Sequence, residues 1–222
     1  MSQIMKKFAR FTSEVITELP GDLEDEILEE FEISCDEAEN LWSIFNEESE
    51  CRRNSKSWQC YPFGFWEELI SYVEMYNIIS PYDYKDYTCF VKGYVLGRVL
   101  DKILDKTSKF KFLVNFGGDM ILRKFDAVGL KGASNSDVVF FSDFPYCYGL
   151  FTSGNTNKRG KHIKGLDRWG TITIIVEEPK PRDMASLDAL CTILFSGAIS
   201  RAEACEIAKS HGYDLMVHEN YK

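Results

Sequence analysis

The sequence predicts an α+β fold, because helical and strand-like patterns alternate along it without the regular spacing of βαβ units. Apolar residues at helical spacing mark several segments, and residues 93–104 are the most regular of them. Short runs rich in β-branched or aromatic residues, such as residues 110–116 and 171–176, indicate buried strands. With 222 residues, 45% of them hydrophobic, the chain suits one domain with a sizeable core. We therefore expect a single α+β domain over residues 1–222.

The N-terminal residues 1–40 are predicted to be helical and acidic. Residues 22–39 hold ten acidic side chains and no basic one, which indicates one or two amphipathic helices with a solvated acidic face. The apolar residues that recur there at helical spacing are Leu23, Ile27, Leu28 and Phe31. A second helical pattern covers residues 65–79 and ends before Pro81, since proline disfavours a helical residue ahead of it.

The C-terminal half is predicted to combine short strands with two helices. Residues 142–170 contain five glycines and are interpreted as loop-rich. An apolar helix is expected over residues 186–195, and the capping box Ser200-Arg201-Ala202-Glu203 opens a last helix that Gly212 ends. The remaining predicted strands are residues 138–141 and 213–218.

Composition excludes several classes of protein. A net charge of −9 argues against a nucleic-acid binder, which needs a basic face for phosphates. The first residues lack the apolar core of a secretory signal, and no apolar run is long enough to span a bilayer, so a cytoplasmic protein with no membrane partner is expected. Seven scattered cysteines without a Cys-x-x-Cys pair favour reduced thiols over a disulfide or zinc framework.

Two segments could form an anion-binding site, one through a glycine turn whose backbone can approach a ligand closely and one through a lysine at a helix start. Asn115-Phe116-Gly117-Gly118-Asp119 follows a hydrophobic strand, and its paired glycines could turn backbone N–H groups toward phosphates. A tight turn without a ligand explains the same residues. Lys92-Gly93-Tyr94 stands at the start of a helix, where a lysine and the helix N-terminus attract anions, although an exposed lysine near a cap is the simpler interpretation.

Two further segments carry hydroxyl, basic or carboxylate groups. Thr152-Ser153-Gly154 is followed by His162, and a glycine-bounded loop of this kind suits a nucleotide, with the histidine exchanging protons near neutral pH. A plain surface loop is the alternative. Asp188 and Thr192 share one helix face, and their oxygens suit Mg²⁺. Hydrogen bonding of these two side chains to nearby backbone is equally compatible with the sequence.

Taken in order, these segments resemble the FAD:protein FMN transferase (ApbE) family. The matching segments are Trp42–Glu50 with Asn54, Val91–Tyr94, Asn115–Asp119, Phe151–Gly154, His162-Ile163 and Ser186–Thr192. The resemblance spans most of residues 42–217 and implies an ApbE-like arrangement of mixed sheets and packed helices in a compact, short version. It also implies an enzyme that splits FAD, transfers FMN through a phosphoester to a Thr or Ser of a target flavoprotein, and releases AMP.

The resemblance assigns roles to individual residues. It implies that Asp188, Thr192 and the Val91 carbonyl hold Mg²⁺, that His162 takes part in proton transfer, and that Lys92 adds positive charge near the phosphates. The flavin dinucleotide site would be lined by Ser43, Asn115, Gly117, Gly118, Asp119, Thr152, Ser153 and Gly154. The implied acceptor is a cytosolic flavoprotein that carries a Ser/Thr flavinylation motif.

The chain also departs from the family pattern. Family members are usually longer, and Asp86–Phe90 stands where they carry Asp-x-Gly-Gly-Ile. Gly97 replaces an aspartate, and Lys164–Asp167 replaces the Asp-Pro segment expected after the histidine. Two alternatives therefore remain beside transfer: a flavin- or nucleotide-binding protein without transferase activity, and an FAD hydrolase that gives FMN and AMP. A structural role without any ligand is the third.

Overall fold

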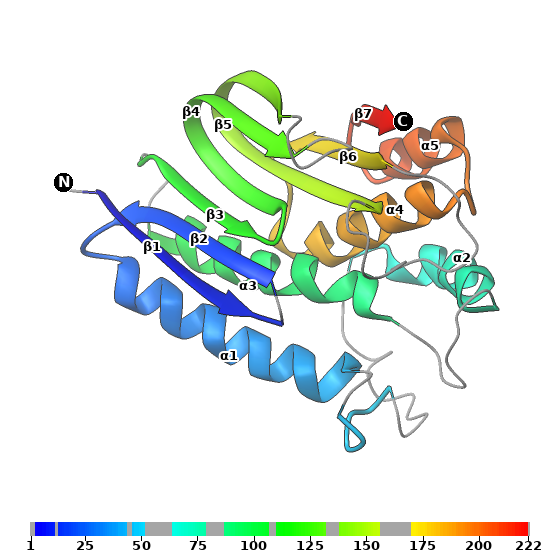
Figure 1. Cartoon of the computed structure of the whole chain (residues 1–222), viewed down its shortest axis with the longest axis horizontal. Coiled ribbons are helices and arrows are strands. Elements are labelled where there is room, and N and C mark those ends of the chain that lie inside the picture. The colour runs from blue at the N-terminus through cyan, green and yellow to red at the C-terminus, as the bar shows by residue number, and fades with distance from the viewer. Residues whose placement is uncertain are drawn as a thin grey trace.

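The fold is α+β, as predicted, and is built on one antiparallel sheet. In the computed structural model, seven strands pair in chain order from β1 to β7, and every neighbouring pair is antiparallel (Figure 1). The strands are β1 Gln3–Arg10, β2 Ser13–Pro20, β3 Phe112–Phe116, β4 Asp119–Lys131, β5 Val138–Asn155, β6 Gly170–Glu177 and β7 Met216–Tyr221. The structure describes residues 3–11, 13–43, 46–51, 64–78, 87–106, 110–131, 138–155 and 170–221.

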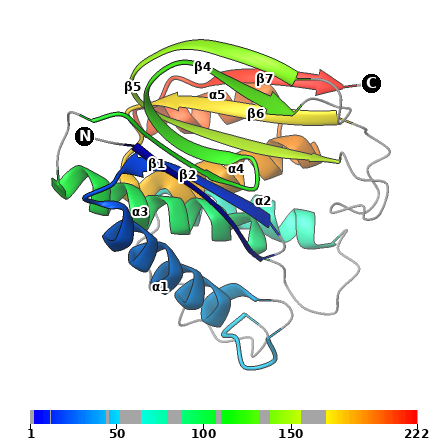
Figure 2. The same cartoon turned by 60° about the vertical axis from the view of Figure 1, so that its left-hand side comes forward.

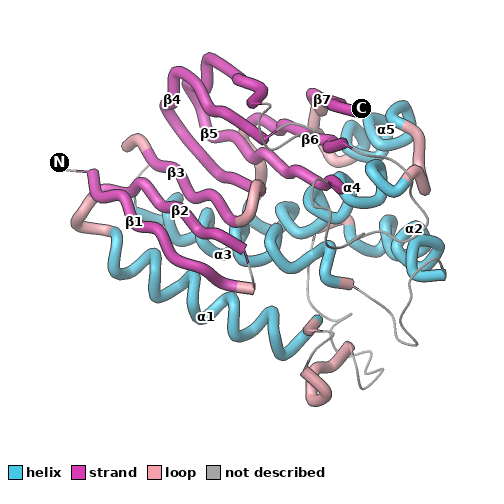
Figure 3. Tube along the Cα trace, viewed as in Figure 1, coloured by secondary structure: helices cyan, strands magenta, loops and turns pink. Residues whose placement is uncertain are grey.

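The helices enter the chain at two points, so the order of the strands is preserved. Three helices follow β2 and two follow β6, and they cover one face of the sheet (Figures 2 and 3). Their bounds are α1 Glu24–Trp42, α2 Trp66–Ile78, α3 Val91–Lys106, α4 Met184–Ser196 and α5 Arg201–Ser210, with 3-10 helices η2 at Thr88–Phe90 and η3 at Pro181–Asp183. None of the described helices combines the length and apolar character needed to cross a membrane.

Two apolar clusters hold these layers together. The larger lies between the sheet and the helices, and its bulkiest fully buried members are Phe31, Trp42, Phe90, Phe112, Phe116, Phe151 and Phe195. The smaller lies on the other face and includes Met120, Leu122, Val128, Phe144, Tyr148, Leu150 and Ile175. Adjacent residues Ile174 and Ile175 of β6 belong to different clusters, so this strand is buried on both faces. Burying both faces of a strand favours an uninterrupted apolar run such as Ile174–Val176 in β6.

The long hairpin of β4 and β5 curls over the smaller cluster (Figure 1). Its register shifts between Arg123 and Phe125, and Lys124 between them has φ 60°, which identifies a β-bulge. A bulge increases the local bend and twist of a strand. The bend brings Val128 and Phe144 back over the sheet to join the smaller cluster.

The sequence interpretation is wrong for several strands. Residues 3–20 form the β1–β2 hairpin, so the N-terminal segment predicted as helical begins with strands, and the acidic helix α1 starts only at Glu24. Strand β5 extends to Asn155 through residues that were predicted as loop, and β7 lies three residues beyond its predicted position. The predicted helices and the Ser200–Glu203 capping box are confirmed.

Candidate functional site

The candidate site begins where α3 meets α4. Gly93, in the first turn of α3, packs directly on α4: a Cβ there would lie 2.6 Å from Asp188 Cβ and 2.8 Å from Ala185 Cα. Because the two helices touch at this glycine, the Gly93 N–H donates to Asp188 Oδ2 at 2.8 Å. Lys92 and Asp188, which the sequence singled out separately, are therefore neighbours.

Asp119 connects the same helix to two strands. It is the first residue of β4 and is fully buried. Its Oδ2 accepts from Lys92 Nζ at 2.8 Å, and its Oδ1 accepts from the Thr152 N–H of β5 at 2.6 Å. Both oxygens are occupied by protein donors, so Asp119 acts here as a positioning residue for Lys92 and β5.

The predicted Gly-Gly turn is confirmed as a two-residue hairpin connection. Gly117 and Gly118 have φ of +62° and +105° and join Phe116 to Asp119, which face each other across the β3–β4 pair. Glycine adopts such left-handed backbone conformations without steric cost. A Cβ on Gly117 would lie 3.7 Å from Lys92 Nζ, so the turn lies beside the lysine.

The sequence suggested that the turn offers its N–H groups to a phosphate, but in the structure both groups donate to protein atoms. The Gly117 N–H donates to Glu14 O at 2.8 Å, and the Gly118 N–H donates to Asn115 Oδ1 at 3.0 Å. The two glycines could still contribute to a ligand site, because they have no side chains that would keep a ligand away from the backbone. Glu14 belongs to β2, and no local signal in the sequence links it to the turn.

The ionisable groups at the centre of the site are Asp119, Asp188 and Lys92. Burial, together with the Asp119 carboxylate, raises the pKa of Asp188 well above its ordinary value, and Lys92 and the Gly93 N–H offset this only in part. Burial lowers the pKa of Lys92, but the attraction of Asp119 and Asp188 outweighs it and the pKa is raised. Lys92 therefore stays a cation at neutral pH, with its side chain 31% exposed.

The residues predicted to hold Mg²⁺ lie on the two helices that meet at Gly93. Asp188 is 7% exposed, and in the described part of the chain its only hydrogen-bond donor is the Gly93 N–H. Thr192 follows one helical turn later on α4, and Val91 is the first residue of α3. Among the described residues no three His, Cys, Asp or Glu side chains gather, so a metal here would rely on one carboxylate with neutral oxygens. Such oxygens are the hard ligands that Mg²⁺ prefers, and the donor set fits the ion.

The structure places some of the other residues predicted to bind the flavin dinucleotide, but it does not describe His162. Thr152, Ser153 and Gly154 lie in β5, paired with β6, and not in the loop that the sequence predicted. Ser43 follows Trp42, whose ring contacts Tyr94 of α3 at 5.3 Å between centroids, so the end of α1 lies near the start of α3. His162 lies outside the described residues and stays a prediction.

Two residues of the site had no signal in the sequence. Thr173 of β6 shares a hydrogen bond of 3.0 Å with the Thr152 hydroxyl, which fixes that side chain on the sheet. Cys191 of α4 is fully buried, and its Sγ donates to Phe151 O at 3.1 Å. The Cys191 contact anchors α4 to the sheet between Asp188 and Thr192. Neither pairing can be foreseen, because both join elements that are distant in the sequence.

The chain has the fold of several solved flavin transferases. A mutant of the flavin transferase ApbE from Vibrio cholerae superposes with a TM-score of 0.65 at 13% identity, covering 100% of this chain and 98% of that one. The Pseudomonas stutzeri flavinyl transferase ApbE in its apo form gives 0.64 at 12%, covering 98% and 95%. The ApbE protein from Thermotoga maritima gives 0.63 at 15%, covering 99% and 97%.

These similarities confirm the predicted resemblance at the level of the fold. No family model matches the sequence. No curated protein matches it either.

Proposed function

We propose that the chain binds FAD at the Lys92–Asp119–Asp188 cluster and, with Mg²⁺, transfers FMN to a Ser or Thr of a target flavoprotein. The observation that supports this best is the convergence of these three residues from α3, β4 and α4, through contacts of 2.8 Å from Lys92 Nζ to Asp119 and from the Gly93 N–H to Asp188. The convergence occurs in the fold that the solved flavin transferases share.

The reaction is a substitution at phosphorus. The acceptor hydroxyl oxygen bonds to the FMN phosphorus of FAD, the bond from that phosphorus to the bridging oxygen breaks, and AMP leaves with the electron pair. The hydroxyl proton passes to a base, a role proposed for His162. Such reactions depend on positioning and on stabilising charge that develops on phosphate oxygens.

The described residues supply positioning and charge. Lys92, held by Asp119, provides a fixed positive charge beside the turn at Gly117 and Gly118. The proposed flavin dinucleotide site is lined by Ser43, Asn115, Gly117, Gly118, Thr152, Ser153 and Gly154, with Asp119 acting behind it. Asp188, Thr192 and the Val91 carbonyl would hold Mg²⁺, which when bound neutralises phosphate oxygens.

The test combines the protein with FAD, Mg²⁺ and a peptide carrying an Asp-x-x-x-Ser-Gly-Ala-Thr acceptor. We expect covalent flavin on the peptide and an equal amount of AMP. Asp188→Asn keeps the side-chain shape but removes its charge, and should reduce labelling by about 100-fold or more, because a site with one carboxylate loses its only anionic ligand. Asp101→Asn, on the exposed face of α3, is the matched control and should keep wild-type labelling.

The alternatives give different outcomes in the same experiment. AMP release without peptide labelling identifies an FAD hydrolase. FAD binding without AMP identifies a binding protein that has lost transfer. Absence of FAD binding contradicts every flavin-based function for this chain.

A further inference from the structure

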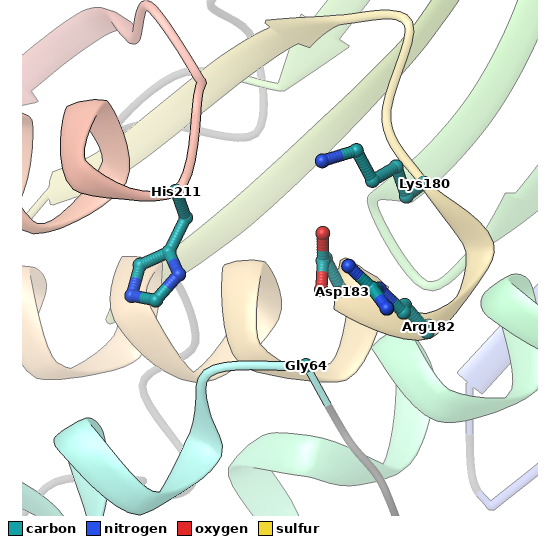
Figure 4. Close-up of a pocket in the computed structure, with 5 residues that line it drawn as sticks. All are labelled: Gly64, Lys180, Arg182, Asp183 and His211. Atoms are coloured by element: carbon teal, nitrogen blue, oxygen red, sulfur yellow. Dashed lines mark ion pairs between the residues drawn. The ribbon is translucent and has the colours of Figure 1, made fainter.

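A polar pocket lies at the start of α4, apart from the candidate site. Its lining residues are Gly64, Lys180, Arg182, Asp183 and His211, and it encloses about 220 Å³ (Figure 4). It shares no residue with the Lys92–Asp119–Asp188 cluster, whose α4 residue lies further along the helix. Neither the flavin reaction nor the family resemblance assigns a role to any of these five residues.

The floor of the pocket is formed by Asp183 and the buried Tyr213 beneath it, which are hydrogen-bonded to each other. Tyr213 OH donates to Asp183 Oδ2 at 2.6 Å and accepts from the Lys180 N–H at 3.1 Å. Tyr213 and Asp183 are only 5% and 4% exposed. A satisfied buried network of this kind fixes the backbone around it. The segment that carries Lys180 and Arg182 is therefore held in place before any ligand arrives.

The opposite wall of the pocket is formed by His211, whose ring is fixed by contacts with Phe65 and Glu68. The His211 ring stacks on Phe65 with 4.3 Å between centroids and an interplanar angle of 13°, and its Nε2 lies 2.7 Å from Glu68 Oε2. Gly64 forms the rim with φ +66°, and a Cβ at this position would overlap Asp183 Oδ1. The pocket thus has walls held by hydrogen bonds and ring stacking, and an edge that only glycine permits.

The pocket concentrates positive charge in a chain whose net charge is −9. Lys180 Nζ lies 5.6 Å from the centre of the Tyr213 ring, and no carboxylate of the described residues lies within ion-pair distance of it. Arg182 contacts Asp183 Oδ1 only through Nε, at 3.6 Å, and its side chain is 71% exposed. Figure 4 shows Lys180 and His211 approaching the gap from opposite sides, with Asp183 below. The buried Asp183 therefore faces the cations Lys180 and Arg182, while the Glu68 carboxylate lies against His211 on the other wall.

We propose that this pocket binds a phosphate group, borne by inorganic phosphate or by a small phosphomonoester. A guanidinium presents paired N–H donors that match phosphate oxygens, and an ammonium adds a point charge. The Glu68 carboxylate is taken up by His211, and the Asp183 carboxylate is partnered by Tyr213, so Lys180 and Arg182 leave an excess positive charge for the ligand to neutralise. A volume of about 220 Å³ accommodates an oxyanion together with a few further atoms.

The test follows backbone amide resonances of the full chain while phosphate is added at constant ionic strength. We expect saturable shifts at Gly64, Asp183 and His211, with inorganic phosphate and glycerol phosphate in separate titrations. Saturation by either probe supports the site, and the tighter of the two identifies the source of the phosphate. Lys180→Gln and Arg182→Gln should each weaken binding about 10-fold, the usual effect of losing a charged hydrogen bond.

Arg201→Gln is the matched control, since it removes one exposed positive charge from α5. The proposal is overturned if the wild-type shifts do not saturate, or if the two pocket variants weaken binding no more than this control. It is also overturned if FAD shifts the same amides and phosphate competes with it, because the pocket would then belong to the flavin site. Failure of flavin transfer leaves this result unaffected.

Discussion

The carboxylate of Asp119 joins the start of α3 to two neighbouring strands through bonds to Lys92 and Thr152. The sequence identified Asp119 as a candidate ligand-binding residue because it follows two glycines. It could not indicate that both carboxylate oxygens are already used, since Lys92 and Thr152 lie 27 and 33 residues away in the chain. At the scale of a residue, the sequence identified Asp119 as a candidate but did not identify its hydrogen-bond partners.

Asp119→Asn tests this positioning role. An amide keeps the shape of the side chain but loses the negative charge, so the pKa of Lys92 should fall, because burial lowers it and Asp119 no longer compensates. The free energy of unfolding should fall by about 1–3 kcal/mol, the cost of disrupting a buried charged hydrogen bond. Urea unfolding measures the stability, and resonances of the Lys92 side chain measure the pKa.

Asp126→Asn, at an exposed position of the same strand, is the control and should change neither quantity. An unaltered Lys92 pKa in Asp119→Asn would show that Asp119 does not set the charge at the site. Under the proposed function, Asp119→Asn should also lower flavin transfer more than it weakens FAD binding.

At the scale of elements, the helices were predictable because their apolar periodicity is local. Strand β4 and β5 beyond residue 141 were not, since β5 carries charged, glycine and proline residues and depends on pairing with β4 and β6. Helix α3 was predicted from its apolar periodicity, but the close packing of its two glycines was not. Gly93 faces α4, and Gly97, one turn later, faces η3 and the first residue of α4, so both allow close contact. From the sequence, Gly97 was only a departure from the family pattern.

Gly97→Ala distinguishes packing from helix propensity. Alanine favours an exposed helix by about 1 kcal/mol over glycine. Here a Cβ would overlap Pro181 O and lie 3.2 Å from Met184 Cβ, so we expect a loss of about 1–3 kcal/mol in the free energy of unfolding. Urea unfolding provides the measurement, with Asp101→Ala at an exposed position of the same helix as a control. A gain in stability would refute close packing of α3 on η3.

At the scale of the whole molecule, the site exists because the sheet follows chain order while helices are inserted at two points. That arrangement brings α3, which precedes β3, against α4, which follows β6. Composition and periodicity predicted the α+β class but not this juxtaposition. The order of motifs that resembles the ApbE family carried that information, since each motif alone is compatible with a simple turn, loop or cap.

The molecule should lose stability at alkaline pH because several acidic protons are held in its core. Burial raises the pKa of the Cys147 thiol from 9.0 to about 12, and burial likewise raises the pKa of Cys191 and of Tyr213. A group whose folded pKa is raised contributes stability fully below its unfolded pKa and loses it as pH rises toward the folded value. The affected window for Cys147 is therefore pH 9 to 12, with a slope of up to about 1.4 kcal/mol per pH unit.

Urea unfolding between pH 7.5 and about 10.5 measures this slope, within the range where denaturant unfolding remains a usable assay. Cys147→Ala removes one such group, so its stability should decline less steeply than that of the wild type even if it is lower at neutral pH. Cys205→Ala, at a partly exposed position of α5, should decline as the wild type does. Parallel declines for all three proteins would mean that Cys147 ionises as readily in the folded chain as in the unfolded one. Buried thiols would then not limit the alkaline stability of this fold.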